Sequence, residues 1–318
     1  MKMTRVNDSK KTTDFKSGFV SIVGRPNVGK STLMNLLVGE KIAIVSNRPQ
    51  TTRNKITCIL TKEDYQIVFI DTPGLHKPKT KLGNYMVKSA GSALGGMDVI
   101  LYLVEPTPKV TEGDAAILEM LPKKAENAKV ILVINKVDTV KKPDILLTID
   151  EYSKYCKNFS FLEIVPISAL TGENTDAVLT TICKYLSPGP KYFPDDMITD
   201  QPERQIVAEM IREKGLTFLQ EEIPHGLAVE IVSMKKRSKA SESLVDVEAT
   251  IYCERESHKS IVIGKGGAML KKIGASSRRD IEMLLGSPIN LQLWVKVRKR
   301  WRDNDLILRN LGYDPKEI

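Results

Sequence analysis

The segment GRPNVGKS, residues 24–31, constrains the fold most, because it joins an apolar, strand-like run to a helix-compatible run. It satisfies the phosphate-loop pattern GxxxxGK(S/T) through Gly24, Gly29, Lys30 and Ser31. Glycines let backbone N–H groups curl around phosphate oxygens, and the N-terminus of the next helix adds partial positive charge. We expect Lys30 to reach the β- and γ-phosphates of a nucleotide and Ser31 to ligate Mg²⁺.

The chain up to residue 186 repeats this alternation of apolar runs and helix-compatible stretches. Five runs bounded by turn signals are typical of buried strands, at residues 18–24, 65–74, 98–106, 129–138 and 163–168. This order predicts an α/β fold with a mostly parallel sheet and helices on both faces. Residues 55–70 predict a hairpin that gives the sheet one antiparallel edge.

A second domain is predicted after a segment, residues 187–203, that contains four prolines. Proline fixes φ and removes an amide donor, so this segment is interpreted as a semi-rigid linker. Beyond it, helical spacing and alternating strands predict a smaller α+β domain, whose first helix Gly215 is expected to interrupt. The predicted boundaries are a loose tail at 1–17, the α/β domain at 18–186, the linker at 187–202 and the second domain at 203–318.

Two further motifs predict the phosphate and magnesium end of a nucleotide site. DTPG begins at Asp71, at the end of a buried strand, where the carboxylate can hold Mg²⁺ through water and the Gly74 amide can contact the γ-phosphate. QTTR places two hydroxyls, Thr51 and Thr52, where a switch loop would deliver one to Mg²⁺. Thr52 is taken as the ligand, with Thr51 left open. The predicted Mg²⁺ ligands are Ser31, Thr52 and Asp71.

The motif NKVD predicts recognition of guanine. The Asp138 carboxylate can accept hydrogen bonds from guanine N1–H and N2–H₂, and adenine offers no such pair. Asn135 and the Lys136 stem would frame the base, while backbone amides of residues 168–170 would contact guanine O6. The predicted GTP-binding set is Gly24, Arg25, Pro26, Asn27, Val28, Gly29, Lys30, Ser31, Thr32, Asp71, Thr72, Pro73, Gly74, Asn135, Lys136, Asp138, Ser168, Ala169 and Leu170.

Two residues bear on hydrolysis. Leu75 stands where many GTPases carry the glutamine that orients the attacking water, and its side chain cannot form hydrogen bonds. The Asn27 amide oxygen either coordinates a cation beside the phosphates or only stabilises the loop. Catalysis is assigned to Lys30, Asn27, Thr52, Asp71 and Gly74.

A second glycine loop, GKGG at residues 264–267, does not fit a nucleotide site. Its outer glycines are too close, and no guanine motif follows it. It matches the GxxG loop of a KH module, which clamps the backbone of single-stranded nucleic acid. Residues 259–302 carry eleven Lys or Arg against two acids, which favours a polyanionic partner over a solvated face. The predicted RNA-binding residues are Gly264, Lys265, Gly266, Gly267, Lys271, Lys272, Arg278, Lys296 and Arg298.

The strand after this loop alternates, so Trp294 is expected on its outer face with Lys296 and Arg298. Trp301 either stacks on a base or packs against the helix, and packing is the favoured role.

Composition excludes several classes of protein. The apolar runs are too short to span a membrane, and the polar N-terminus predicts no secretory signal. The four cysteines form no CxxC pair, which is typical of reduced thiols in a cytoplasmic protein.

The chain resembles the Era family of GTPases through GRPNVGKSTLMNLLVGEKIAIVSNRPQTTRN, DTPGLHKPK, NKVD, YFPDDMITDQPER and IVIGKGGAMLKKIG. The resemblance implies a phosphate-loop GTPase domain joined to a KH domain of type II, in a protein we expect to be a monomer. It implies GTP and GDP as ligands, binding to the 3′ region of 16S rRNA, and a role in 16S rRNA maturation and assembly of the 30S subunit. It also implies partial association with the inner membrane face, and a K⁺ ion at Asn27.

Two alternatives stay open at this point. In one, the protein is an RNA-binding assembly factor in which GTP is mainly a structural ligand. In the other, it is a GTPase that works at a membrane surface, which is disfavoured because no long amphipathic face accompanies the basic charge.

Overall fold

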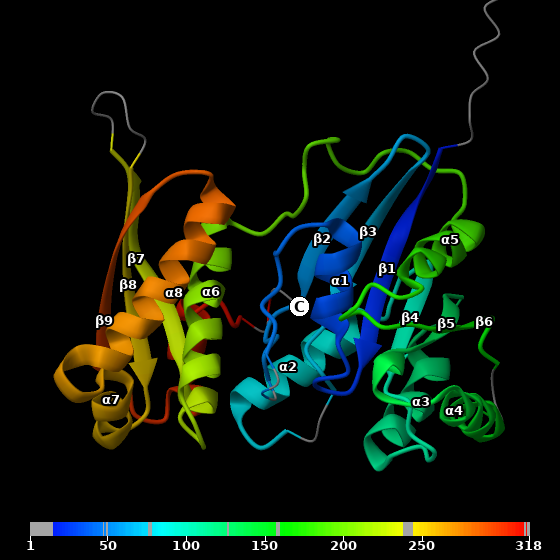
Figure 1. Ribbon diagram of the computed structural model, residues 1–318, viewed down its shortest axis with the longest axis horizontal. Helices are drawn as coiled ribbons and strands as arrows, with labels where there is room; N and C mark the ends of the chain where they lie inside the picture. The colour runs from blue at the N-terminus through cyan, green and yellow to red at the C-terminus, as the bar shows by residue number, and fades with distance from the viewer. Residues whose placement is uncertain are drawn as a thin grey trace, which may run out of the picture.

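The computed structural model describes residues 15–46, 48, 50–75, 78–125, 127–156, 160–237, 244–314 and 316. Figure 1 shows two units side by side, with the N-terminal unit at the right and the C-terminal unit at the left. Residues 1–14, most of the predicted tail, lie outside the described residues. The first strand begins at Lys16, inside the segment predicted as tail.

The first unit is a six-stranded sheet in the order β2-β3-β1-β4-β5-β6. All neighbouring strands are parallel except the β2–β3 pair, so the predicted antiparallel edge is confirmed. The strands are β1 (Lys16–Gly24), β2 (Ile56–Thr61), β3 (Tyr65–Asp71), β4 (Val99–Val104), β5 (Lys129–Ile134) and β6 (Glu163–Pro166). The helices are α1 (Lys30–Val38), α2 (Lys81–Ser92), α3 (Glu112–Lys124), α4 (Lys142–Tyr155) and α5 (Thr175–Tyr185).

Helices cover both faces of this sheet, as the alternating pattern predicts. On one face, Leu33 of α1 and Ile182 of α5 belong to a buried cluster with alternate residues of the strands. On the other face, Leu118 of α3 and Tyr152 of α4 pack with the remaining strand residues. Burial on both faces explains why the strands are continuously apolar.

The second unit has the element order α-β-β-α-α-β of the predicted type II KH fold. Its sheet has the order β7-β8-β9, with β7 antiparallel and β9 parallel to β8. Its main elements are α6 (Glu203–Phe218), β7 (Ala228–Lys236), β8 (Val245–Cys253), α7 (Glu256–Ile263), α8 (Ala268–Leu285), β9 (Ile289–Val297) and α9 (Asp305–Asn310). Apolar residues of α6 and α8, such as Met210 and Ile281, pack on one face of the sheet.

The prediction that Gly215 interrupts the first C-terminal helix is wrong. Helix α6 continues through Gly215 to Phe218. A Cβ at Gly215 would lie 2.7 Å from the Leu227 side chain. The glycine therefore permits close packing against Leu227, at an intrinsic helix cost of about 1 kcal/mol.

The linker lies along the first unit. Pro188 pairs with Lys16, and Thr199 pairs with Cys58. The buried Gln66 amide donates to the Phe193 carbonyl oxygen at 2.9 Å and accepts from its amide at 3.0 Å. The contacts at Cys58 and Gln66 hold the linker against the edge of the sheet that is formed by β2 and β3, and the pair with Lys16 holds its start beside β1.

The two units share an apolar junction. Leu82, Tyr85 and Met86 of α2 are buried together with Trp301 and Tyr313 of the second unit. Trp301 is completely buried, and its Nε1–H donates to the Gly226 carbonyl oxygen at 2.9 Å. Trp301 is packed, as favoured, but its buried neighbours lie in α2, α9 and the strands of the KH unit rather than in the helix that follows the glycine loop.

The two tryptophans of the chain offer a test of this packing. Trp301→Ala should lower the free energy of unfolding by about 3–5 kcal/mol, because it opens a large cavity at the junction. Trp294→Ala should cost about 1 kcal/mol or less, because that side chain is 44% exposed on the outer face of β9. Urea titrations followed by circular dichroism would measure both, and equal costs would contradict the assignment.

Candidate nucleotide-binding site

A cleft opens at the carboxyl ends of the parallel strands, where α/β sheets commonly bind ligands. It is open to solvent, with about 970 Å³ of empty space when its mouth is included. The predicted nucleotide-binding residues that line it are Pro26, Asn27, Gly29, Lys30, Ser31, Thr32, Gly74, Asn135, Lys136, Asp138, Ala169 and Leu170. Of the other predicted residues, Arg25 is partly exposed, and the rest are buried: Gly24, Val28, Asp71, Thr72, Pro73 and Ser168.

The phosphate loop runs from the end of β1 to the start of α1. Gly29 has φ +100°, and a Cβ there would lie 2.2 Å from the Asn135 side-chain nitrogen. A Cβ on Gly74 would lie 2.7 Å from the backbone of Pro26. Both glycines are therefore required by close approach, and they bring the three sequence motifs into contact.

Lys30 lies under the loop. Its ammonium group is buried and donates to the carbonyl oxygens of Gly24 at 3.2 Å and Arg25 at 2.9 Å. Burial lowers the pKa of Lys30 to about 8, and the charge of Asp71 partly opposes this shift. A phosphate group at the loop would stabilise the charged form of this lysine.

Three oxygen-bearing side chains converge beside the loop. The Ser31 hydroxyl donates to Asp71 Oδ2 at 2.5 Å and lies 3.0 Å from Thr52 Oγ1. Thr52 Oγ1 lies 3.4 Å from the same carboxylate oxygen. The Thr51 hydroxyl instead donates to the Arg48 carbonyl oxygen at 2.6 Å. The structure therefore places Thr52, rather than Thr51, beside the other two predicted ligands.

Asp71 has the features of a cation ligand. Its Oδ1 atom is buried and has no hydrogen-bond partner among the described residues. Burial raises the pKa of the Asp71 carboxyl group, against the opposing charge of Lys30. A buried carboxylate beside two hydroxyls matches the oxygen ligands that Mg²⁺ prefers.

At the base end of the cleft, Asn135 connects two loops. Its side-chain NH₂ donates to the Val28 carbonyl oxygen, and its Oδ1 accepts from the Ala169 amide, both at 2.8 Å. The Ser168 amide donates to the Glu173 carbonyl oxygen at 3.0 Å. Among the three amides predicted to contact guanine O6, only that of Leu170 has no partner in the described part of the chain.

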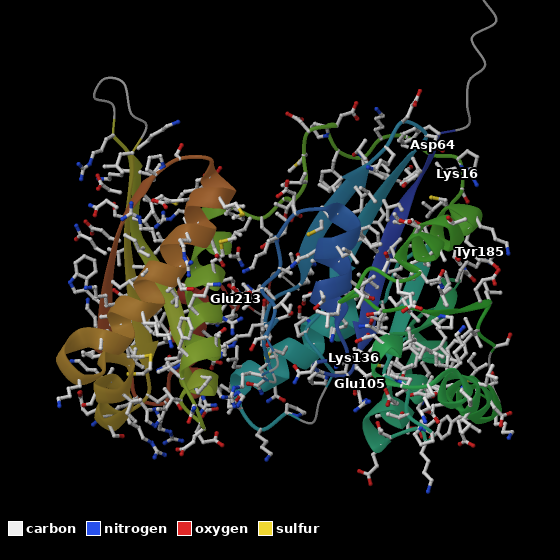
Figure 2. The ribbon with its side chains drawn as sticks, in the orientation of Figure 1. Lys16, Asp64, Glu105, Lys136, Tyr185 and Glu213 are labelled. Atoms are coloured by element: carbon white, nitrogen blue, oxygen red, sulfur yellow. The ribbon has the colours of Figure 1, made fainter. Side chains whose placement is uncertain are left out.

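Asp138 and Lys136 border the mouth of the cleft. Asp138 is exposed there, as recognition of a base requires. Lys136 has φ +66°, and its ammonium group forms an ion pair with Glu105. Figure 2 labels both members of this pair at the end of the sheet.

Glu105 and Asp114 are supporting residues that motif analysis missed. Glu105 also lies 3.5 Å from the guanidinium group of Arg25, which pairs with the fully buried Asp114 of α3 at 2.7 Å. This chain of charges joins the phosphate loop to the base-binding loop through Lys136. The position of Glu105, directly after a buried parallel strand, was the available signal.

Leu75 and Asn27 lie where the sequence predicts. Leu75 packs against the apolar cluster under α3 and α4, so its side chain supplies no polar contact to water. Asn27 is exposed at the cleft with φ +65°.

The second glycine loop lies between two helices of the KH unit. Helix α7 ends at Ile263, and α8 begins at Ala268. Gly264, Gly266 and Gly267 all have positive φ, at +75°, +59° and +80°. Lys265 is exposed in this turn. The loop has the open backbone that close approach of a nucleic-acid backbone requires.

The predicted RNA-binding side chains fall into separate groups. Lys271 and Lys272 are exposed in the first turn of α8, next to the glycine loop. Arg278 is two turns farther along the helix and pairs with Glu282 at 2.8 Å.

Lys296 and Arg298 alternate with the apolar residues of β9 that face α8, so they lie on the outer face of the sheet with Trp294. The Arg298 guanidinium group stacks 4.3 Å from the Tyr252 ring centroid. The sequence predicts a single set of RNA-binding residues, but in the fold the members of this set lie on separate surfaces.

Two further features of the described residues bear on other chemistry. Within them, no three His, Cys, Asp or Glu side chains gather as a metal cluster. None of the helices that the structure describes is both long and apolar enough to cross a membrane.

Comparisons with known proteins agree with this geometry. The model of the family "50S ribosome-binding GTPase" matches residues 19–136, and the KH domain model matches residues 222–302. The chain is 58% identical over 302 residues to GTPase Era of Clostridioides difficile, covering 95% of this chain and 100% of that protein. It is 55% identical over 298 residues to GTPase Era of Clostridium kluyveri, covering 94% and 99%.

Two solved structures are similar over nearly the whole chain. Era in complex with MgGDPNP and nucleotides 1506–1542 of 16S ribosomal RNA has a TM-score of 0.89 and 42% identity, covering 94% of this chain and 99% of that one. A variant of Aquifex aeolicus Era bound to GDP and AlF4⁻ has a TM-score of 0.88 and 41% identity, covering 94% and 100%. The chain therefore belongs to the Era family and is a GTP hydrolase with a C-terminal KH domain.

Proposed function

We propose that the cleft binds GTP and hydrolyses it to GDP and phosphate, with the predicted residues in the roles assigned above. The observation that carries this proposal is the convergence of Ser31, Thr52 and Asp71 oxygens beside Lys30. Asp138 stands at the other end of the same cleft, where its carboxylate can accept from guanine.

Ser31, Thr52 and Asp71 would hold Mg²⁺, which a solved relative contains with its nucleotide analogue. When bound, the ion neutralises charge on the β- and γ-phosphates. Lys30 and the loop amides orient the phosphate chain and hold it against the N-terminus of α1. Because Leu75 offers no hydrogen bond, the attacking water must be held by backbone groups or by a cation at Asn27.

We propose further that the KH domain binds the 3′ region of 16S rRNA and that the protein acts in 16S rRNA maturation and 30S subunit assembly. The Era structure solved with a 16S rRNA fragment supports this, and so does the open glycine loop beside Lys265, Lys271 and Lys272. Cytoplasmic location is part of the proposal. Association with the inner membrane face, which the resemblance implies, stays a prediction that binding to anionic vesicles would test.

Guanine selectivity should depend on Asp138. Asp138→Asn replaces an acceptor with an amide, so GTP affinity should fall about 100-fold, equal to about 2.7 kcal/mol. Xanthosine triphosphate, which offers a carbonyl at that edge, should gain affinity. Competition binding with GTP, ATP and XTP measures this, and Asp150→Asn on the exposed face of α4 is the matched control. Equal affinity of the natural protein for ATP and GTP would contradict the role of Asp138.

Hydrolysis should be slow and should respond to potassium through Asn27. Replacing sodium by potassium at constant ionic strength should raise turnover at least about fivefold, a modest share of typical electrostatic catalysis. Asn27→Ala should remove the difference between the two ions while GDP affinity is kept. Turnover that is equal in sodium and potassium would show that Asn27 only shapes the loop.

The glycine loop of the KH domain should bind RNA phosphates and no second nucleotide. The double change Lys265→Asp and Gly266→Asp adds two carboxylates, and it should weaken single-stranded RNA binding by at least ~2 kcal/mol. GTP affinity should stay unchanged, because Lys30 lies in the other domain.

Titrating RNA with GDP or a non-hydrolysable GTP analogue present separates a nucleotide-controlled switch from a factor in which GTP is structural. RNA affinity that is the same with both nucleotides would favour the structural role. Unchanged RNA binding by the double variant, or two guanine nucleotides per chain, would overturn the assignment of the loop.

A further inference from the structure

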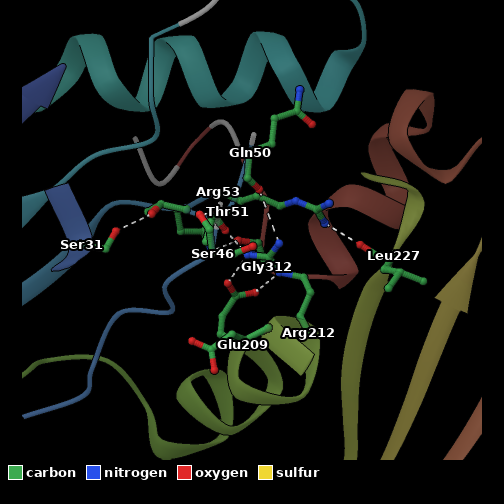
Figure 3. A network of polar contacts seen from close by, with 12 residues as sticks. Ser31, Ser46, Gln50, Thr51, Arg53, Glu209, Arg212, Leu227 and Gly312 are labelled. Carbon is green, nitrogen blue, oxygen red and sulfur yellow. Dashed lines mark hydrogen bonds and ion pairs between the residues drawn. The ribbon is translucent and has the colours of Figure 1, made fainter. Parts of the chain in front are cut away.

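The segment that carries Thr52 lies against the KH domain. Figure 3 shows the segment around Gln50, Thr51 and Arg53 joined by polar contacts to Arg212 of α6, which in turn contacts Glu209 of the same helix. The two domains therefore meet directly behind one of the three converging oxygens of the nucleotide site.

Arg212 makes the central contact. Its side chain is completely buried, and its guanidinium group donates to the backbone carbonyl oxygens of Thr51 and, at 3.5 Å, of Gln50. Glu209 accepts from the same group, at 2.8 Å from Nε, and fixes its orientation. A planar guanidinium with several donors suits this fork-like contact, which an ammonium group cannot reproduce.

The held backbone has an unusual conformation. Gln50 has φ +61°, which costs free energy for a residue with a side chain. Arg212 donates to the carbonyl oxygens of Gln50 and of the next residue, Thr51. It therefore stabilises the backbone at the residue whose φ is unfavourable. Two positions after Gln50, the chain presents the Thr52 hydroxyl to Ser31 at 3.0 Å.

Helix α6 also contacts the chain before Gln50, at Lys41 and Val45. Glu213 accepts from the Val45 amide at 2.9 Å and pairs with Lys41 at 2.7 Å. On the far side of Thr52, the buried Arg53 donates to the carbonyl oxygens of Leu227 at 2.6 Å and His225 at 3.1 Å. Thr52 is therefore bracketed by contacts with the KH domain.

We propose that Arg212 is a positioning residue of the GTP site that the KH domain supplies. By holding the carbonyl oxygens of residues 50 and 51, it keeps the Thr52 hydroxyl beside Ser31 and Asp71. This inference rests on the proposed GTP and Mg²⁺ site. Thr52 would bind the Mg²⁺ ion beside the γ-phosphate, a group that GDP lacks. By positioning Thr52, Arg212 therefore favours binding of Mg²⁺–GTP over binding of GDP.

The test compares Arg212→Met and Arg212→Lys in the full chain with the natural protein. Affinities for GDP and for a non-hydrolysable GTP analogue are measured across a Mg²⁺ titration, together with turnover. Arg212→Met should weaken binding of the analogue at least about tenfold and raise the Mg²⁺ concentration needed, while GDP affinity changes less than about twofold. Arg212→Lys should recover part of the loss, because it keeps the charge but loses the fork.

Arg204→Met is the matched control, because Arg204 is exposed on the same helix and donates to the Ile231 carbonyl oxygen of the KH domain at 2.6 Å. It should leave both affinities unchanged. Should Arg212→Met fail to fold, Glu209→Gln releases the guanidinium group without removing it, and it should cause a smaller loss in the same direction.

Equal weakening of GDP and analogue in the folded variants, or no change in either, would overturn the proposal. These outcomes are separate from failure of the proposed function, which would show as absence of Mg²⁺-dependent GTP binding in the natural protein.

Discussion

The parallel pairing of β1 with β3 is the constraint on which the nucleotide site depends. In this register Ile22 lies opposite Asp71, and the Thr72 hydroxyl donates to the Ile22 carbonyl oxygen at 2.9 Å. The phosphate loop and Asp71 therefore leave the sheet at the same edge. Side chains that are 40 positions apart, Ser31 and Asp71, meet because both follow the carboxyl ends of adjacent strands.

The junction between the domains combines apolar packing with two buried arginines. Burial, with the neighbouring charge of Arg212, lowers the pKa of Arg53. Backbone carbonyl oxygens and Glu209 accept from the Arg212 guanidinium group, and the carbonyl oxygens of Leu227 and His225 accept from the Arg53 group, whose Nε has no partner among the described residues. Removing either arginine would leave buried carbonyl oxygens without donors, so these contacts specify one arrangement of the two domains more than they add stability.

The KH domain presents its basic residues on more than one surface. The glycine loop and the first turn of α8 form one surface, and the outer face of β9 forms another. A single-stranded RNA held at the loop need not contact Lys296 or Arg298. The two surfaces can therefore be tested separately, by variants that leave the loop intact.

The sequence by itself determined the α/β order, the antiparallel edge, the KH domain and the nucleotide motifs, because each depends on local spacing and turn chemistry. It also placed Trp294 on the outer face of β9, since side chains alternate along a strand. Only the tertiary structure chose Thr52 over Thr51, paired Arg25 with Asp114 and carried α6 unbroken through Gly215. It alone brought Arg212 behind Thr52, 160 positions away along the chain. Such long-range contacts depend on how two folded surfaces meet, and no periodicity or local motif encodes that geometry.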